Sequence, residues 1–410
     1  MHAVWLFKAS VMGFSARYPI WLPTAPKPTA AAFTLLFVIE SLARASVATV
    51  IALQAYDLLQ SSQKVSQVYT VVAIGSLIGT LLIPLLIQRT ARRFIYSFGG
   101  LALILAALAL ASYTLEGQVA GMFLRVFGAA CLNVTTSLYI LDHIRKHDYV
   151  RVEPMRMTFA TFSWTIGPSL GVWLYTTYGV WAPHAFTAVC SMILLAVFWY
   201  LRLSDNTAIR AGKVKPATPL ASIARFARQP RLRLAWLIAF GRSCFWVVFF
   251  VYAPILMVQS GLGKQAGGFL VSAGNAMLIT AILFGKYAQR VGVRQVIAMA
   301  FFAMAACTFG AGLAGADHPY VTAGLLLAAS LAATAIDGVG SIPFLRAVHS
   351  HERAEMTGVY RTYLDLSELL PTALFSVLLL FAPLSAVFLA LGVWSAICGA
   401  IAWRYLPKRL

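Results

Sequence analysis

Charged residues are scarce in this sequence. Only 11% of its 410 residues are Asp, Glu, Lys or Arg, whereas 60% are apolar. A water-soluble domain carries about a quarter charged residues, and it could not bury this much apolar surface. The composition therefore excludes a soluble globular fold, and it excludes an intrinsically disordered chain for the same reason.

Acidic residues are scarcer still. There are 13 Asp and Glu against 32 Lys and Arg, which gives a formal net charge of +19. In a soluble protein this excess would indicate nucleic-acid binding. In a membrane protein it arises because Lys and Arg accumulate in cytoplasmic loops. The low total charge favours the second interpretation, so we expect a lipid bilayer and not nucleic acid as the partner.

Motifs for disulfide, metal or nucleotide chemistry are missing. None of the five cysteines belongs to a CxxC pair, and all of them lie in apolar runs, so we expect neither disulfides nor a metal site. The segment 261–264 lacks the glycine spacing of a phosphate-binding loop, so ATP is not the expected energy source. No cofactor is expected, and no convergent set of His, Asp and Cys residues indicates an enzyme.

The sequence is instead dominated by long apolar runs, and a membrane-spanning helix needs roughly 20 apolar residues. Twelve runs lie at approximately 32–55, 67–88, 95–113, 118–142, 157–178, 183–201, 233–258, 267–287, 295–315, 320–344, 359–382 and 384–405. We therefore predict an all-α integral membrane protein with twelve transmembrane helices. Its predicted parts are an N-terminal tail (1–30), a six-helix bundle (31–201), a linker (202–232) and a second six-helix bundle (233–410).

Basic residues alternate between the predicted loops. They gather at 89–93, 145–156, 202–233, 290–294 and 346–353, whereas the loops on the other side hold only Lys64 and Lys264. Because positive loops stay in the cytoplasm, we expect both termini to be cytoplasmic. The expected location is the cell membrane, specifically a bacterial inner membrane.

The two halves repeat each other at a constant offset. Arg145 and Arg346, like Met155 and Met356, lie 201 positions apart. The basic loop at 89–93 recurs at 290–294 with the same offset. This repeat predicts two pseudo-symmetric halves in parallel orientation, an architecture of transporters in which the substrate path runs between the repeats.

With this organisation the chain resembles the major facilitator superfamily from about residue 31 to 410. Residues 285–294 are similar to the family pattern Gly-x-x-x-Asp-Arg-x-Gly-Arg-Lys/Arg, with glutamine in the place of Asp; residues 84–93 depart further from it. The resemblance implies that these loops help to lock the halves together on the cytoplasmic side. The expected gate residues are Arg89, Arg93, Gln289, Arg290, Arg294 and Arg361.

Two shorter segments add to the resemblance. Arg125 followed by Gly128 is similar to an intramembrane Arg–Gly feature of the family. Gly167, Pro168 and Gly171 resemble the Gly-Pro-x-x-Gly signature associated with antiporters, which implies a bend in the fifth helix and favours proton-coupled export. Uptake by a proton symporter or uniporter stays open as an alternative, and so does a lipid flippase.

Charges within the apolar runs indicate where function lies, because a charge at bilayer depth costs roughly 2.5–3.5 kcal/mol. The helices that line the central cavity in the superfamily each carry at least one such charge. We expect these charges to contact substrate or protons, with Glu40 and Arg44 able to pair at a spacing of four. The alternative is that many of them form gate ion pairs. The residues are Glu40, Arg44, Arg125, Arg242 and Asp337.

Asp365 and Glu368 share one face of the eleventh predicted helix with Arg361, and they are the second proton-carrier candidates. Aromatic residues such as Trp164 and Trp246 could stack an aromatic substrate, or could belong to the core. Together these features predict a monomeric secondary transporter that works by alternating access. Its predicted substrate is a small polar or amphiphilic molecule, and its predicted coupling ion is the proton.

Overall fold

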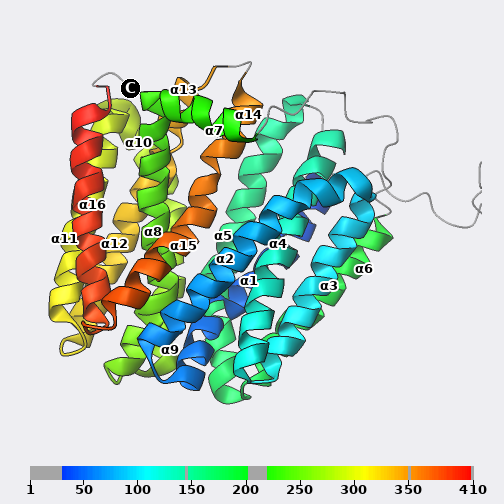
Figure 1. Ribbon diagram of the computed structural model, residues 1–410, viewed down its shortest axis with the longest axis horizontal. Coiled ribbons are helices and arrows are strands. Elements are labelled where there is room, and N and C mark those ends of the chain that lie inside the picture. Colours follow the sequence, from blue (N-terminus) through cyan, green and yellow to red (C-terminus); the bar gives the residue numbers. More distant parts are fainter. Residues whose placement is uncertain (1–29, 144–145, 202–218, 350–351, 408–410) are drawn as a thin grey trace, which may run out of the picture.

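The computed structural model describes residues 30–143, 146–201, 219–349 and 352–407 (Figure 1). The predicted N-terminal tail, apart from its last residue, and residues 202–218 of the predicted linker lie outside these ranges. Within the described ranges every regular element is a helix. The prediction of an all-α protein is therefore confirmed.

The first six predicted runs coincide with six helices. They are α1 (Ala30–Leu59), α2 (Ser62–Arg89), α3 (Arg92–Ala111), α4 (Leu115–His143), α5 (Lys146–Thr177) and α6 (Trp181–Tyr200). The predicted linker contains one short helix, α7 (Pro219–Arg228).

The later runs also coincide with helices, but several of these are interrupted. The elements are α8 (Pro230–Gln259), α9 (Gly263–Ala276), the 3-10 turn η1 (Met277–Thr280), α10 (Ala281–Val291), α11 (Val293–Ala314), α12 (Pro319–Val339), α13 (Ile342–Ala347), α14 (Arg353–Tyr360), α15 (Thr362–Leu378) and α16 (Ser385–Tyr405).

Nine helical segments among the described residues are long and apolar enough to cross a membrane. Two of them, 263–291 and 319–347, run through a local break in the helix. The other three predicted crossings correspond to α2, α5 and α15, which lie among the nine in Figure 1. Helix α15 is not one of the nine segments because it has only 17 residues. The structure thus confirms an integral membrane fold, while the count of twelve crossings stays a prediction.

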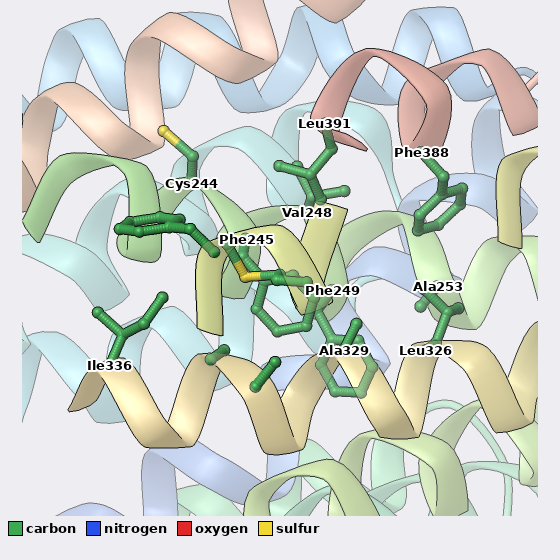
Figure 2. Packing of buried hydrophobic residues seen from close by; sticks show 14 of the residues in the cluster. Cys244, Phe245, Val248, Phe249, Ala253, Leu326, Ala329, Ile336, Phe388 and Leu391 are labelled. Atoms are coloured by element: carbon green, nitrogen blue, oxygen red, sulfur yellow. The ribbon is translucent and has the colours of Figure 1, made fainter. Parts of the chain in front are cut away.

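Helices α1–α6 and α8–α16 form two groups that lie side by side (Figure 1). The largest core lies mostly in the second group and includes Ala52, Ala55 and Val65 of the first. In it, Phe245 and Phe249 of α8 lie between residues of α12 such as Leu326 and residues of α16 such as Phe388 (Figure 2). A separate core joins α1, α3, α4 and α6 through residues that include Leu36 and Tyr96. Each group therefore buries much of its apolar surface within itself.

The glycines of the predicted bend in the fifth helix lie at a contact between α1 and α5. A Cβ atom at Gly167 would lie 2.5 Å from the Cβ atom of Ala45, and one at Gly171 would overlap the carbonyl oxygen of Ser46. Membrane helices approach closely where residues are small. The α-helix continues through Pro168 to Thr177. These glycines therefore allow two helices of the first group to pack closely.

The two ends of the bundle differ. Helices α7, α13 and α14 and the described C-terminal region lie at one end, which we call the linker end (Figure 1). The α1–α2 and α8–α9 connections lie at the opposite end, which we call the hairpin end.

Candidate functional site

A cavity lies between the two helix groups. It is lined by α1, α2, α4 and α5 from the first group and by α8 and α15 from the second. It contains about 920 Å³ of space not filled by protein atoms, part of it open to solvent. This volume lies within the usual range for small-molecule sites. The charged and aromatic lining residues are Arg44, Arg125, Glu368, Tyr69, Trp164, Trp246 and Phe250.

The two arginines of the cavity are connected to each other. Arg44 Nη1 donates a hydrogen bond to Glu40 Oε1 at 3.2 Å, one turn earlier on α1. Arg125 Nη2 of α4 donates to the backbone carbonyl oxygen of Arg44 at 3.0 Å. Glu40 is only 1% exposed, so it supplies a buried negative charge beside the two cations. Like charges at close range need such a counter-charge.

The acid that faces this pair comes from the other helix group. Glu368 of α15 lines the cavity, and it is an exposed residue. In the described part of the chain its carboxylate makes no hydrogen bond and no ion pair. Its electrostatic neighbours include Arg44, Arg125 and Asp365. Asp365 is partly buried and is not among the cavity residues.

The other two predicted cavity charges form a separate group. Arg242 of α8 makes an ion pair with Asp337 of α12 inside the second helix group. Trp246 Nε1 donates to the other carboxylate oxygen of Asp337 at 2.9 Å. The Arg242 guanidinium also lies 5.7 Å from the centre of the Tyr363 ring. The pair contributes to the cavity wall through Trp246, whose position it fixes.

The predicted gate residues make few contacts. Arg93 lies over the ring of Phe94, and Arg294 lies over the ring of Trp403, each at 5.0 Å. No ion pair in the described part of the chain joins one of these residues to the other helix group. The side chain of Arg89 lies outside the described residues. Those of the remaining three are exposed, namely Gln289, Arg290 and Arg361.

One interaction at the hairpin end was not predicted from the sequence. Lys264 Nζ of α9 lies 2.6 Å from Asp57 Oδ2 of α1. Tyr175 of α5 donates its hydroxyl to the same oxygen at 2.6 Å, and its ring lies 5.0 Å from the Lys264 ammonium group. We call these three residues the hairpin clamp. The available signal was Lys264 itself, one of only two cations predicted on that side.

Further hydrogen bonds join the helix groups near the clamp. Ser66 of α2 and Tyr252 of α8 are linked at 2.8 Å. Gln259 Nε2 donates to Tyr56 Oη at 3.1 Å. The backbone N–H of Ser169 in α5 donates to Ser272 Oγ in α9 at 2.9 Å. The structure therefore shows a conformation in which the hairpin end is closed.

Known proteins resemble this chain in sequence family and in fold. The sequence model of the Major Facilitator Superfamily matches residues 33–372. Comparison with curated proteins gives no match. The fold is similar to a D-xylose-proton symporter, with a TM-score of 0.73 and 12% identity over 92% of this chain and 98% of that one.

Two other solved structures show the same fold. A peptide transporter POT in complex with sulfate has a TM-score of 0.70 and 14% identity, over 92% of this chain and 94% of that chain. The nucleoside transporter NupG has a TM-score of 0.68 and 13% identity, over 92% and 99% of the two chains. Since the family match also covers most of the sequence, the chain belongs to the Major Facilitator Superfamily, and it is a membrane transporter and not an enzyme.

Proposed function

We propose that this protein is a proton-coupled secondary transporter, which carries a small molecule through the cavity between its two helix groups by alternating access. The observation that carries the proposal is Glu368. It is a carboxylate exposed in the cavity, without an ion pair in the described part of the chain, on the opposite helix group from Arg44 and Arg125. The fold similarity to a D-xylose-proton symporter supports proton coupling.

Glu368 suits a proton carrier because two influences act on it in opposite directions. Nearby guanidinium groups favour a charged carboxylate, whereas apolar surroundings favour the protonated acid. A movement of α15 relative to α1 and α4 changes the balance between them. Glu40 is a poorer candidate, because it is buried and paired with Arg44 on its own helix.

The hairpin clamp supports alternating access. In this state the ion pair between Asp57 and Lys264 joins the two helix groups at one end. Rocking toward the opposite state separates these residues. The predicted gate residues at the linker end then come together, with Gln289 contributing a neutral hydrogen-bonding group where the family pattern has an acid. We propose that the linker end is cytoplasmic, because the basic loops lie there.

The glycines of the fifth helix do not decide the direction of transport. The predicted preference for export relied on Gly167, Pro168 and Gly171, but the two glycines have a structural reason in the packing of α5 on α1. That packing is needed for either direction. Proton-coupled export stays the first candidate, and proton symport with uptake is the second. The second is favoured because protonation of Glu368 leaves Arg44 and Arg125 with one positive charge that Glu40 does not balance.

The test uses purified full-length protein in proteoliposomes with a pH-sensitive dye inside. A thermal-stability screen of metabolites first selects a ligand. Glu368→Gln should abolish proton movement driven by that ligand while ligand exchange at equal concentrations continues. Glu116→Gln is the matched control, because Glu116 is exposed at the hairpin end and lies outside the cavity. Ligand-driven proton movement that survives in Glu368→Gln would refute the proposed carrier.

A further inference from the structure

We infer that the cavity selects a small organic monoanion, whose anionic group is bound by Arg44 and Arg125 and whose flat apolar body lies against Trp164, Trp246 and Phe250. This inference rests on the proposed function, because it takes the cavity between the helix groups as the transport site.

The two cavity arginines keep hydrogen-bond donors that no protein group uses. A guanidinium group has five N–H donors and no acceptor. In the described structure Arg44 and Arg125 each make one hydrogen bond, to Glu40 and to the Arg44 carbonyl oxygen respectively. Arg44 Nη2 and Arg125 Nη1 have no hydrogen-bond partner there and are not fully buried, so a ligand can reach them, whereas the two Nε atoms are enclosed by protein. A carboxylate is the group whose two oxygens match this arrangement of donors.

The cavity lining offers few neutral hydrogen-bonding groups. The described cavity residues include no Ser, Thr, Asn, Gln, His or Lys, and apart from the three charged residues they are Ala, Val, Ile, Met, Tyr, Trp and Phe. A sugar would bring several hydroxyl groups for which this wall provides few partners. Each hydroxyl left unpartnered weakens binding by about tenfold or more. The lining therefore disfavours polyhydroxylated substrates, although a xylose symporter shares the fold.

Aromatic rings form one wall of the cavity. Trp164 of α5 and Phe250 of α8 are in edge-to-face contact, with ring centres 5.5 Å apart. Trp246 lies 6.2 Å from Phe250 and is oriented by its hydrogen bond to Asp337. Both helix groups thus contribute rings to one side of the cavity. Aromatic rings of this kind bind flat apolar groups in offset or edge-to-face geometry.

The charges around the cavity decide how many negative charges the substrate carries. Arg44 and Arg125 are balanced by Glu40, which pairs with Arg44, and by ionised Glu368; Asp365 lies outside the cavity and interacts with Arg361. Protonation of Glu368 leaves one positive charge in excess, which a monoanion neutralises. The groups that interact with Glu368 are Asp365, Arg44, Arg125 and Tyr69. A proton and a monoanion therefore bind together, which is the behaviour of a symporter.

The inference is tested by binding to the purified full-length protein in nanodiscs, without any gradient, by calorimetry. The probes are phenylpropionate, its neutral amide, phenylpropylamine and D-xylose. Phenylpropionate should bind at least about tenfold more tightly than the amide, and the amine and xylose should give no measurable binding. Arg125→Gln should abolish the preference for phenylpropionate over the amide. Arg231→Gln, an exposed arginine outside the cavity, should retain it.

Equal or tighter binding of the amide, the amine or xylose would overturn the inference, and so would a folded protein that binds none of the probes. Because the measurement needs no proton gradient, it is independent of proton coupling. Selective phenylpropionate binding without proton movement in vesicles would refute only the proposed function. Proton movement driven by an uncharged ligand would refute only the present inference.

Discussion

Arg125 of α4 donates a hydrogen bond to the backbone carbonyl oxygen of Arg44 of α1, with Nη2 3.0 Å from the oxygen. A helix carbonyl in mid-bundle normally accepts only from its own helix. This additional bond holds the Arg125 guanidinium against the backbone of Arg44, so both cations belong to one site in the cavity.

Two substitutions of Arg125 distinguish the contribution of its charge to ligand binding from that of its planar shape. Arg125→Lys keeps a positive charge but loses the planar fork, and Arg125→Gln loses both. We expect ligand binding to fall in both variants, by at least about tenfold in Arg125→Gln. The yield of folded protein should stay close to wild type. Calorimetry and size-exclusion chromatography measure these two properties, with Arg231→Gln as control. Wild-type affinity in Arg125→Gln would show that this residue does not bind the ligand.

The ion pair between Asp57 and Lys264 is predicted to control conformation more than stability. Their side chains are 16% and 31% exposed, and pairs of this kind contribute about 1 kcal/mol or less to folding. Asp57→Asn should therefore have little effect on melting but should favour opening of the hairpin end. Distances between spin labels placed at that end report the change. The exchanged pair Asp57→Lys with Lys264→Asp should restore part of the closed population, and its failure to do so would argue against a direct pair.

Loss of the Asp337 carboxylate should destabilise the fold more than loss of the Asp57 carboxylate. Asp337→Asn leaves Arg242 without its counter-charge in a partly buried position, and breaking a buried pair costs about 3–5 kcal/mol. We expect a clear loss of thermal stability together with loss of transport. The double variant Asp337→Asn with Arg242→Gln should recover much of the stability but not the transport. A single variant as stable as wild type would contradict the pairing.

Gly171 tests the close contact between α1 and α5. A methyl group at this position would overlap the Ser46 carbonyl oxygen, whereas one at Gly324 in α12 meets no atom within 4 Å. Gly171→Ala should therefore greatly reduce the yield of folded protein. Gly324→Ala should be tolerated, or should stabilise the helix by about 1 kcal/mol. Fluorescence-detected chromatography compares the two variants, and equal yields would mean that the helices adjust at little cost.

The fold was largely predictable because it follows from one-dimensional patterns. Apolar runs of about 20 residues specify membrane helices regardless of their neighbours, and the predicted run 183–201 differs little from α6. The break at Met277–Thr280 was not predictable, since nothing in an apolar run marks where a helix changes its winding. The contact made by Gly171 was also hidden, because its partner is more than a hundred residues away in sequence.

The site was only partly predictable for the same reason. Charges in apolar runs drew attention to Arg44, Arg125 and Glu368, which line the cavity, but a sequence cannot show which charges share a cavity. The structure groups Arg242 with Asp337 instead. Asp57 was overlooked because it stands at the end of its helix, where a charge is unremarkable until Lys264 is placed beside it.

The central claim is that Glu368 carries the proton during transport. Proteoliposomes loaded with a pH-sensitive dye and given an inward gradient of phenylpropionate test it most directly. Protein-free vesicles give the baseline, because the neutral acid crosses the bilayer by itself and releases a proton inside. Wild-type protein should acidify the interior faster than this baseline as the anion enters, and Glu368→Gln should acidify it no faster than the baseline. Wild-type acidification no faster than that of protein-free vesicles, or unchanged acidification in Glu368→Gln, would contradict the account.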